Sequence, residues 1–265
     1  MNQEAPTSHY ANKFETERHI LVADLAERFG FFRLAIENNL LQVFEEHNIQ
    51  NRKEYHDFGH TLNVFYNVVN MHLVAIHNDQ FEKERLNEEE LAILLTSVIF
   101  HDIVFDSSKK EKSNEELSSE TAMKLIGDRA STEEADFIKE LILSTTTSVN
   151  ESGLIRTHYC DIANERLKLM IKYIQDADLG NLGDENFPRA TIQLMREYKI
   201  EEESFEQFLK TQLNILGNFE YNTNVGKYVF SRLANNYNDL DEFINSKIIS
   251  VRTYIEHFKV VGIDE

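Results

Sequence analysis

The sequence predicts an all-α protein, and three observations lead to this prediction. Apolar residues recur at helical spacing through most of the 265 residues, whereas strictly alternating runs are nearly absent. Two prolines and nine glycines are few helix breakers for a chain of this length. These breakers form no cluster that would mark a linker. We therefore expect one helical domain over residues 1–265.

The predicted helices follow one another along the chain. Apolar positions from Phe14 to His47 predict one long helix, or two helices broken near Gly30. The spacing predicts later helices over about 58–77, 88–100, 115–126, 132–145 and 164–177, with at least three more between Pro188 and Phe258. Residues 145–149 have a composition typical of a strand over a short span.

The most apolar of these helices ends in a polar pair. Ten uncharged residues, Leu91–Phe100, follow Asn87 and three glutamates, which predicts a capped and largely buried helix. His101 and Asp102 come directly after it. A carboxylate in apolar surroundings needs a compensating partner, and a metal cation is one of the few strong ones. We therefore expect His101 and Asp102 to form the floor of a site.

Two residues on other helices are expected to join this pair. His60 falls on the apolar face of its helix, so its ring should point inward. Asp178 continues the apolar stripe of its own helix, whereas Asp176 turns away, so we expect Asp178 to be the buried carboxylate of the two. With His101 and Asp102 they form a mixed nitrogen and oxygen set. Such a set suits a divalent cation such as Mn, Fe, Co, Ni or Zn, and Mg remains a candidate.

The order His60, His101-Asp102, Asp178 resembles the H…HD…D signature of the HD-domain metal-dependent phosphohydrolases. Local strings are similar to a bacterial branch of predicted HD hydrolases: Tyr55-His-Asp-Phe-Gly-His60, Phe100-His-Asp-Ile-Val-Phe105, Asn114-Glu-Glu-Leu-Ser118, Asp176-Ala-Asp-Leu-Gly-Asn-Leu-Gly183 and Arg196-Glu-Tyr198. The resemblance covers roughly residues 50–235. It implies that the four residues bind a metal within an all-α bundle. The signature-bearing core would span about 50–185, and a C-terminal helical extension about 188–260.

The chain departs from the branch at two positions. Ser148 stands where the branch usually has a histidine, which counts against a second metal ion or a histidine-assisted proton transfer there. Glu54 replaces a common arginine, which removes a candidate phosphate contact. HD proteins with two metals need two further histidines between Asp102 and Asp178, and here only His158 lies between them. We therefore expect one metal ion, and a di-iron oxygenase is disfavoured.

The expected reaction is hydrolysis of a phosphate ester by metal-activated water. Asp102 or Glu115 could orient the water, although a glutamate in the first turn of a helix also stabilises that helix without any catalytic role. His56 could act as an acid or a phosphate donor, or could have no role. The candidate phosphate contacts are the cations Lys109, Lys110, Lys112 and Arg196. For the three lysines a solvated loop is the simpler interpretation, and Arg196 could equally form a structural salt bridge.

Composition restricts the partners. The formal charge of −19 has the wrong sign for holding nucleic acid, and no segment approaches the roughly 18 apolar residues that a membrane span needs. The lone cysteine, Cys160, excludes an intramolecular disulfide and fits a cytoplasmic location. We expect a small phosphorylated substrate, with a nucleotide as the preferred class. The helices after Pro188 fit a lid or a homodimer interface equally well.

The alternative function is regulatory. Ser148 and Glu54 both depart from the branch, so turnover could have been lost while the metal site remained. The chain would then be an HD module that contains a metal and binds a nucleotide-like ligand.

Overall fold

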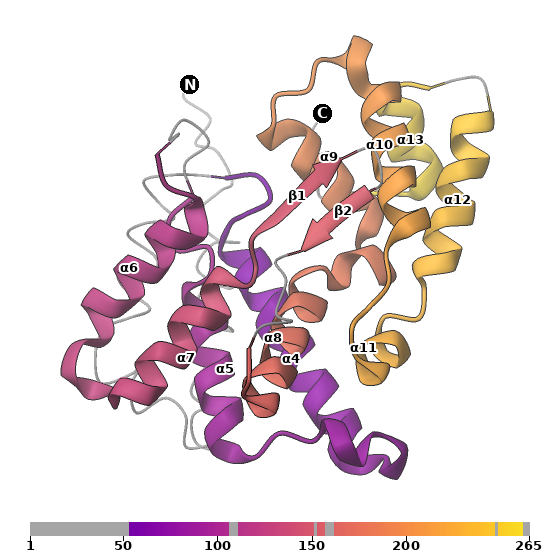
Figure 1. The fold of residues 1–265 in the computed structure, drawn as a ribbon. Coiled ribbons are helices and arrows are strands. Elements are labelled where there is room, and N and C mark those ends of the chain that lie inside the picture. The colour runs from indigo at the N-terminus through magenta and orange to yellow at the C-terminus, as the bar shows by residue number, and fades with distance from the viewer. Residues whose placement is uncertain (1–52, 106–110, 151–152, 157–161, 247–248, 262–265) are drawn as a thin grey trace, which may run out of the picture. The chain divides into compact units, whose positions relative to one another are not determined.

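The computed structural model describes residues 53–105, 111–150, 153–156, 162–246 and 249–261, which all belong to one compact unit, Glu45–Glu265. The described residues are predominantly helical and contain one short β-hairpin, so the all-α prediction is confirmed (Figure 1). The helices expected within Phe14–His47 lie outside the described residues, as do Lys109, Lys110, His158 and Cys160.

The α-helices are α4 (Phe58–His77), α5 (Glu88–Phe100), α6 (Asn114–Ile126), α7 (Thr132–Leu143), α8 (Glu165–Asp178), α9 (Phe187–Glu197), α10 (Phe205–Asn218), α11 (Asn224–Val229), α12 (Leu233–Asn245) and α13 (Val251–Phe258). Short 3₁₀ helices cover Asp79–Glu84, Gly127–Arg129, Gly180–Gly183 and Glu202–Ser204. The strands β1 (Thr147–Asn150) and β2 (Gly153–Arg156) pair antiparallel, with Thr147 opposite Arg156. None of the described helices combines the length and the apolar character needed to cross a membrane.

Side-chain caps fix where several helices begin. At α5, the Asn87 side chain accepts a hydrogen bond from the Glu90 N–H and the Glu90 side chain accepts one from the Asn87 N–H. Ser113 and Ser131 form the same type of capping box at α6 and α7. These signals are local in sequence, which explains why the starts of these helices agree with the prediction to within one residue.

The end of α7 differs from the prediction. The helix stops at Leu143 and not at Thr145. The hydroxyls of Ser144, Thr145 and Thr146 donate back to the carbonyls of the residues three positions earlier. These bonds occupy carbonyls at the helix end, and the chain then extends into β1.

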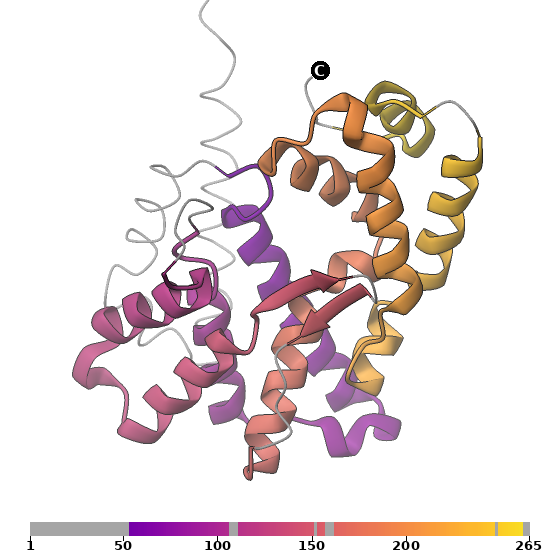
Figure 2. The ribbon, with the colours of Figure 1, turned by 45° about the horizontal axis from the view of Figure 1, so that its top comes forward.

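Helices α4, α5 and α8 contact one another and form the centre of the described unit (Figures 1 and 2). The side chains between them are apolar and at most 1% exposed, and include Val64, Val68, Met71, Leu94, Val98, Ile171 and Ile174. Helix α7 packs against α5 and α8, and α6 packs against α7. This burial brings the ends of three helices that are distant in sequence close together.

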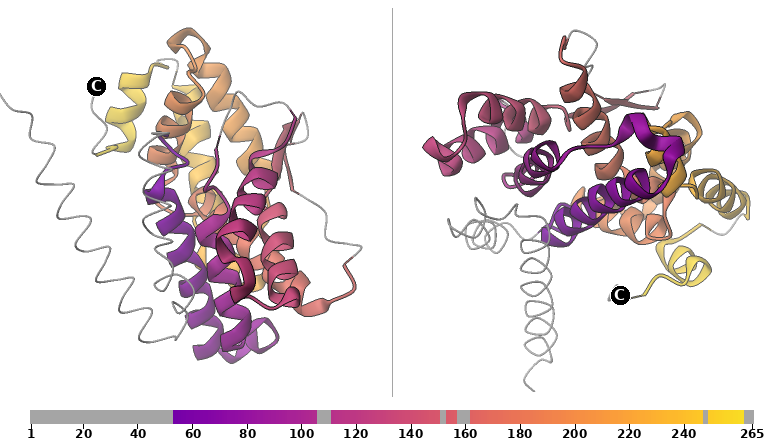
Figure 3. Two further views of the ribbon diagram at one scale, coloured as in Figure 1. Left: turned by 90° about the vertical axis from the view of Figure 1, so that its left-hand side faces the viewer. Right: turned by 90° about the horizontal axis from the view of Figure 1, so that it is seen from below.

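The C-terminal helices pack beside this centre (Figure 3). Helix α10 contacts α12, α9 and strand β2, while α13 contacts α9. Helix α11 contacts both α4 and α8. At the start of α11, the N–H groups of Asn224 and Val225 each donate a hydrogen bond to one carboxylate oxygen of Glu84. These bonds hold the start of α11 against the 3₁₀ helix that follows α4.

Candidate metal centre

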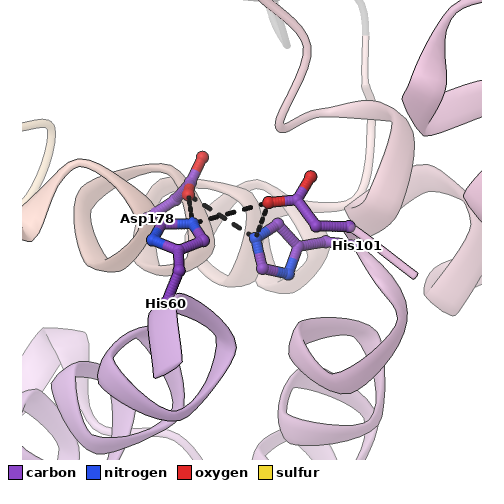
Figure 4. A group of neighbouring side chains, drawn as sticks. His60, His101 and Asp178 are labelled. Carbon is purple, nitrogen blue, oxygen red and sulfur yellow. Dashed lines mark hydrogen bonds and ion pairs between the residues drawn. The ribbon is translucent and has the colours of Figure 1, made fainter. Parts of the chain in front are cut away.

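Three helix ends bring four side chains together. His60 lies in the first turn of α4, His101 follows the last residue of α5 with Asp102 next to it, and Asp178 is the last residue of α8. Figure 4 shows His60 and His101 directed toward Asp178. One ligand atom from each of the four residues lies within 4.8 Å of every other. We call His60, His101, Asp102 and Asp178 the His/Asp cluster.

The distances within the His/Asp cluster are short. The Nε2 atom of His60 lies 3.0 Å from Oδ1 of Asp178 and 3.5 Å from Oδ2 of Asp102. The Nε2 atom of His101 lies 3.1 Å from Oδ2 of Asp102 and 3.5 Å from Oδ1 of Asp178. Both rings are nearly buried, with side-chain exposures of 6% for His60 and 1% for His101. Each imidazole therefore faces both carboxylates.

The ring of His101 is oriented by its other nitrogen. Its Nδ1 lies 2.7 Å from the carbonyl oxygen of Val98, so Nδ1 carries a proton and donates it. In the neutral ring, Nε2 then presents a lone pair, and this buried atom has no hydrogen-bond partner in the described part of the chain. A lone pair that faces carboxylate oxygens is repelled unless a cation or a proton lies between them. The geometry thus fits a metal ligand held by a backbone carbonyl.

The charges of the His/Asp cluster shift its pKa values strongly. Burial alone would raise the pKa of Asp102, but the charge of His101 outweighs burial and lowers the pKa to about 2. For Asp178, burial is likewise outweighed by His101 and His60, and the pKa lies far below its usual range. Burial would lower the pKa of His101, yet Asp102 and Asp178 raise it well above its usual value. Both carboxylates are therefore ionised at neutral pH, and a positive charge is favoured beside them.

These residues together can hold a metal ion. Two imidazole nitrogens and two carboxylate oxygens form a donor set that suits borderline divalent cations. The Nε2 of His101 supports this interpretation, because this buried ligand atom makes no hydrogen bond to the described residues and faces only the two carboxylates. The sequence analysis predicted all four residues, and the structure places them together as one possible metal-binding group.

One detail of the sequence analysis is wrong. Asp178 was expected to be the buried carboxylate and Asp176 the one turned away, but Asp176 is 0% exposed and the Asp178 side chain is 15% exposed. Asp176 accepts hydrogen bonds from the Asn222 N–H, the Thr223 N–H and the Thr223 hydroxyl. Helix α8 is thus buried on two sides: Asp176 holds the start of α11, while Asp178 faces the His/Asp cluster.

His56, a catalytic candidate of the sequence analysis, lies beside the His/Asp cluster. Its ring centroid is 5.6 Å from that of His60, and its ring stacks on Phe105 at 4.1 Å with an angle of 15° between the planes. Its Nδ1 pairs with Glu197 at the end of α9. Burial would lower the pKa of His56, but Glu197 and the two cluster aspartates raise it. Glu197 and Phe105 therefore hold His56 in place beside the His/Asp cluster.

Two tyrosines border the same region. The ring of Tyr55 lies 4.7 Å from that of His60, and burial together with Asp178 and Asp102 raises its pKa well above the usual value. Burial of the hydroxyl and the charges of Glu197, Asp102 and Glu115 raise the pKa of Tyr198, although its ring is 52% exposed. Both hydroxyls thus remain protonated and can donate hydrogen bonds.

Of the four candidate phosphate contacts, the structure describes Lys112 and Arg196. Lys112 is exposed and forms an ion pair with Glu120, so this lysine already has a partner. Arg196 lies in the last turn of α9, next to Glu197, and its contact with a substrate stays a prediction. Ser148 and Glu54, the two departures from the branch, are both exposed.

Sequence reasoning did not single out Glu197 or Tyr55. Both residues lie within strings that carry the family resemblance, but their role depends on contacts across 141 and 142 residues. An acidic residue at the end of a helix is not distinctive by itself, so no local signal could have identified Glu197. Comparison with known proteins finds no family model and no curated protein that matches this chain.

Proposed function

We propose that this chain is a metal-dependent phosphohydrolase of the HD type that acts on a small phosphorylated metabolite, with a nucleotide as the first candidate. One observation carries the proposal: the unpartnered Nε2 of His101 faces two ionised carboxylates, with His60 beside them. The resemblance of these same residues to the H…HD…D signature supports it. One divalent cation from among Mn, Fe, Co, Ni, Zn and Mg would occupy the His/Asp cluster.

A cation held there would offset the charge of a phosphate oxygen and lower the pKa of a water molecule. Asp102 remains ionised and can accept a hydrogen bond from that water, which orients it. Glu115, in the first turn of α6, is a second candidate for this task. In its charged form, with a proton on each ring nitrogen, His56 would donate from Nε2 to a phosphate oxygen or to the leaving group.

The charge of the chain supports a small substrate. A formal charge of −19 opposes the approach of a nucleic acid polymer, whose backbone would be repelled over many phosphates. A single phosphate ester carries few charges, and the cation would offset part of them. Lys112 and Arg196, with Lys109 and Lys110, remain candidate contacts for the rest of the substrate.

The test combines metal analysis with a hydrolysis screen. The purified protein is analysed for bound metal and then assayed on nucleotides, generic phosphoesters and cyclic dinucleotides with Mn, Co, Ni or Mg added. We expect about one metal ion per chain and metal-dependent turnover that Asp102→Ala abolishes. Asp239→Asn, an exposed change on α12, serves as the control with unchanged activity.

Two results would contradict the proposal. If His101→Ala left the metal content unchanged, the assignment of the metal ligands would be wrong. If the wild-type protein bound one metal ion but hydrolysed no compound, the hydrolase would be refuted, and the regulatory module that binds a nucleotide-like ligand would take its place.

A further inference from the structure

The carboxylate of Glu197 makes two separate kinds of contact. Its Oε2 atom accepts hydrogen bonds from the N–H groups of Tyr55 at 2.9 Å and His56 at 3.0 Å. Its Oε1 atom pairs with Nδ1 of the His56 ring. The Glu197 side chain is only 4% exposed, so water competes little for these bonds. One oxygen thus fixes the backbone of the loop before α4, and the other fixes an imidazole.

The position of the His56 ring is set by further contacts. Phe105 stacks on it almost in parallel, and Phe105 comes three residues after Asp102 of the His/Asp cluster. His60 of the His/Asp cluster lies 5.6 Å from the His56 ring between ring centroids. Because Nδ1 is engaged by Glu197, a substrate at the His/Asp cluster could bond only to Nε2.

We propose that Glu197 is a positioning residue that keeps a proton on Nδ1 of His56 and so directs Nε2 toward the substrate. A carboxylate accepts and cannot donate, so the nitrogen that faces Glu197 carries a proton. The tautomer of His56 is thereby determined by a residue 141 positions away in the sequence. The catalytic part of this inference rests on the proposed function, whereas the tautomer does not.

The variant Glu197→Gln separates a purely structural role of Glu197 from a role in positioning the His56 ring. Fixing the loop requires only that an oxygen accept from the two main-chain N–H groups, and glutamine can supply that oxygen. In Glu197→Gln the amide NH₂ would then face Nδ1, which would have to accept, so the neutral ring would move its proton to Nε2. The variant therefore keeps the loop and reverses the tautomer.

The first measurement is the protonation of the two ring nitrogens by long-range ¹H–¹⁵N correlation NMR. The chain has ten histidines, so His56 can be assigned from the signals missing in His56→Gln. We expect a protonated Nδ1 in the wild-type protein and an unprotonated Nδ1 in Glu197→Gln. A wild-type Nδ1 without a proton, or an Nδ1 protonated in both proteins, would overturn the proposal. Glu202→Gln removes the same charge at an exposed site and should leave the spectrum of His56 unchanged.

The second measurement is kinetic and uses whatever substrate the hydrolysis screen identifies. We expect Glu197→Gln to lower kcat at least tenfold, with KM and metal content little changed. The analogous loss of a carboxylate that orients histidine in serine proteases lowers kcat by about 10⁴-fold through the wrong tautomer. When Glu197→Gln is added to His56→Gln, kcat should not fall further. If kcat fell by the same factor as in the wild-type background, Glu197 would act independently of His56, which would overturn the proposal.

The two measurements separate the failure of this inference from the failure of the proposed function. If the wild-type protein has no turnover, the hydrolase is refuted while the NMR result still decides the tautomer. If turnover is present and the tautomer is as expected, but kcat of Glu197→Gln equals that of the wild type, positioning of His56 has no catalytic role and the proposal is overturned. The wild-type spectrum alone tests the tautomer, even if the variant fails to fold.

Discussion

Substitutions of the two aspartates at the end of α8 are expected to have different effects on stability and on metal binding. Asp176→Ala removes the acceptor of three hydrogen bonds, at 2.7 Å to the partly buried Asn222 N–H, 2.8 Å to the buried Thr223 N–H and 2.7 Å to the buried Thr223 hydroxyl. A buried donor without a partner costs about 1–3 kcal/mol. The hydroxyl can rotate toward another acceptor, so the loss of stability comes mainly from the two N–H groups. The free energy of unfolding should therefore fall by about 2–6 kcal/mol, which is twice the cost of one such group.

Asp178→Asn should have a smaller effect on the metal-free protein. Asp178 has one hydrogen bond to His60, at 3.0 Å, and asparagine can still accept it. We expect the unfolding free energy to fall by about 1–2 kcal/mol, the size of one weakened hydrogen bond to a charged group. The variant should however lose the stabilisation that Mn²⁺ gives to the wild type, because one of the four ligands has lost its charge.

Urea unfolding followed by circular dichroism tests both changes. Each protein is unfolded once with EDTA and once with excess Mn²⁺, and the unfolding free energies are compared. Asp176→Ala should be strongly destabilised with EDTA and should still gain stability from Mn²⁺. The reasoning is refuted if Asp176→Ala unfolds like the wild type, or if Asp178→Asn gains as much from Mn²⁺ as the wild type does. Asp239→Asn is the control for the change of charge.

Three further predictions concern single residues. His101→Ala should reduce bound metal from about one ion per chain to nearly none, as measured by mass spectrometry of the metal. Burial lowers the pKa of His72 below 6.5, so the unfolded chain binds a proton more readily than the folded one. The contribution of His72 to stability should therefore fall as the pH drops below about 6.5, so the unfolding free energy at pH 5.5 relative to pH 7.5 should be higher in His72→Leu than in the wild-type protein. In Gly183→Ala the added Cβ would lie 2.3 Å from the carbonyl oxygen of Phe230. The melting temperature should drop by several degrees, and an unchanged value would contradict the packing described around Gly183.

Sequence patterns predicted the His/Asp cluster because its members follow apolar stripes. His60 lies on the inner face of α4, and His101 and Asp102 follow the buried helix α5, so their environment could be inferred from neighbouring residues. The same reasoning misassigned Asp176, because a helical projection assumes one buried face. Helix α8 contacts α4, α5, α7 and α11, and the last of these comes 46 residues later. No periodicity within α8 could reveal that second buried side.

The contacts of His56 show a second limit of sequence reasoning. The string Arg196-Glu-Tyr198 drew attention to its first and last residues, whereas the middle residue holds the loop before α4. Only the packing of α9 brings Glu197 to His56, and the sequence between them carries no signal of that pairing. The local string could identify a segment near the site, but it could not identify Glu197 as the residue that contacts His56.

The position of Asp178 is determined by protein contacts that involve no cation. Asn67 of α4 donates to the carbonyl of Ala177 at 2.8 Å, and the Tyr221 hydroxyl lies 3.1 Å from the carbonyl oxygen of Leu179. These bonds hold the residues on both sides of Asp178, while Asp176 is held by the start of α11. Two ionised carboxylates would otherwise move apart, since like charges repel. Because packing keeps Asp178 near Asp102, a cation that binds there need not order the chain, and more of its binding energy remains available for affinity.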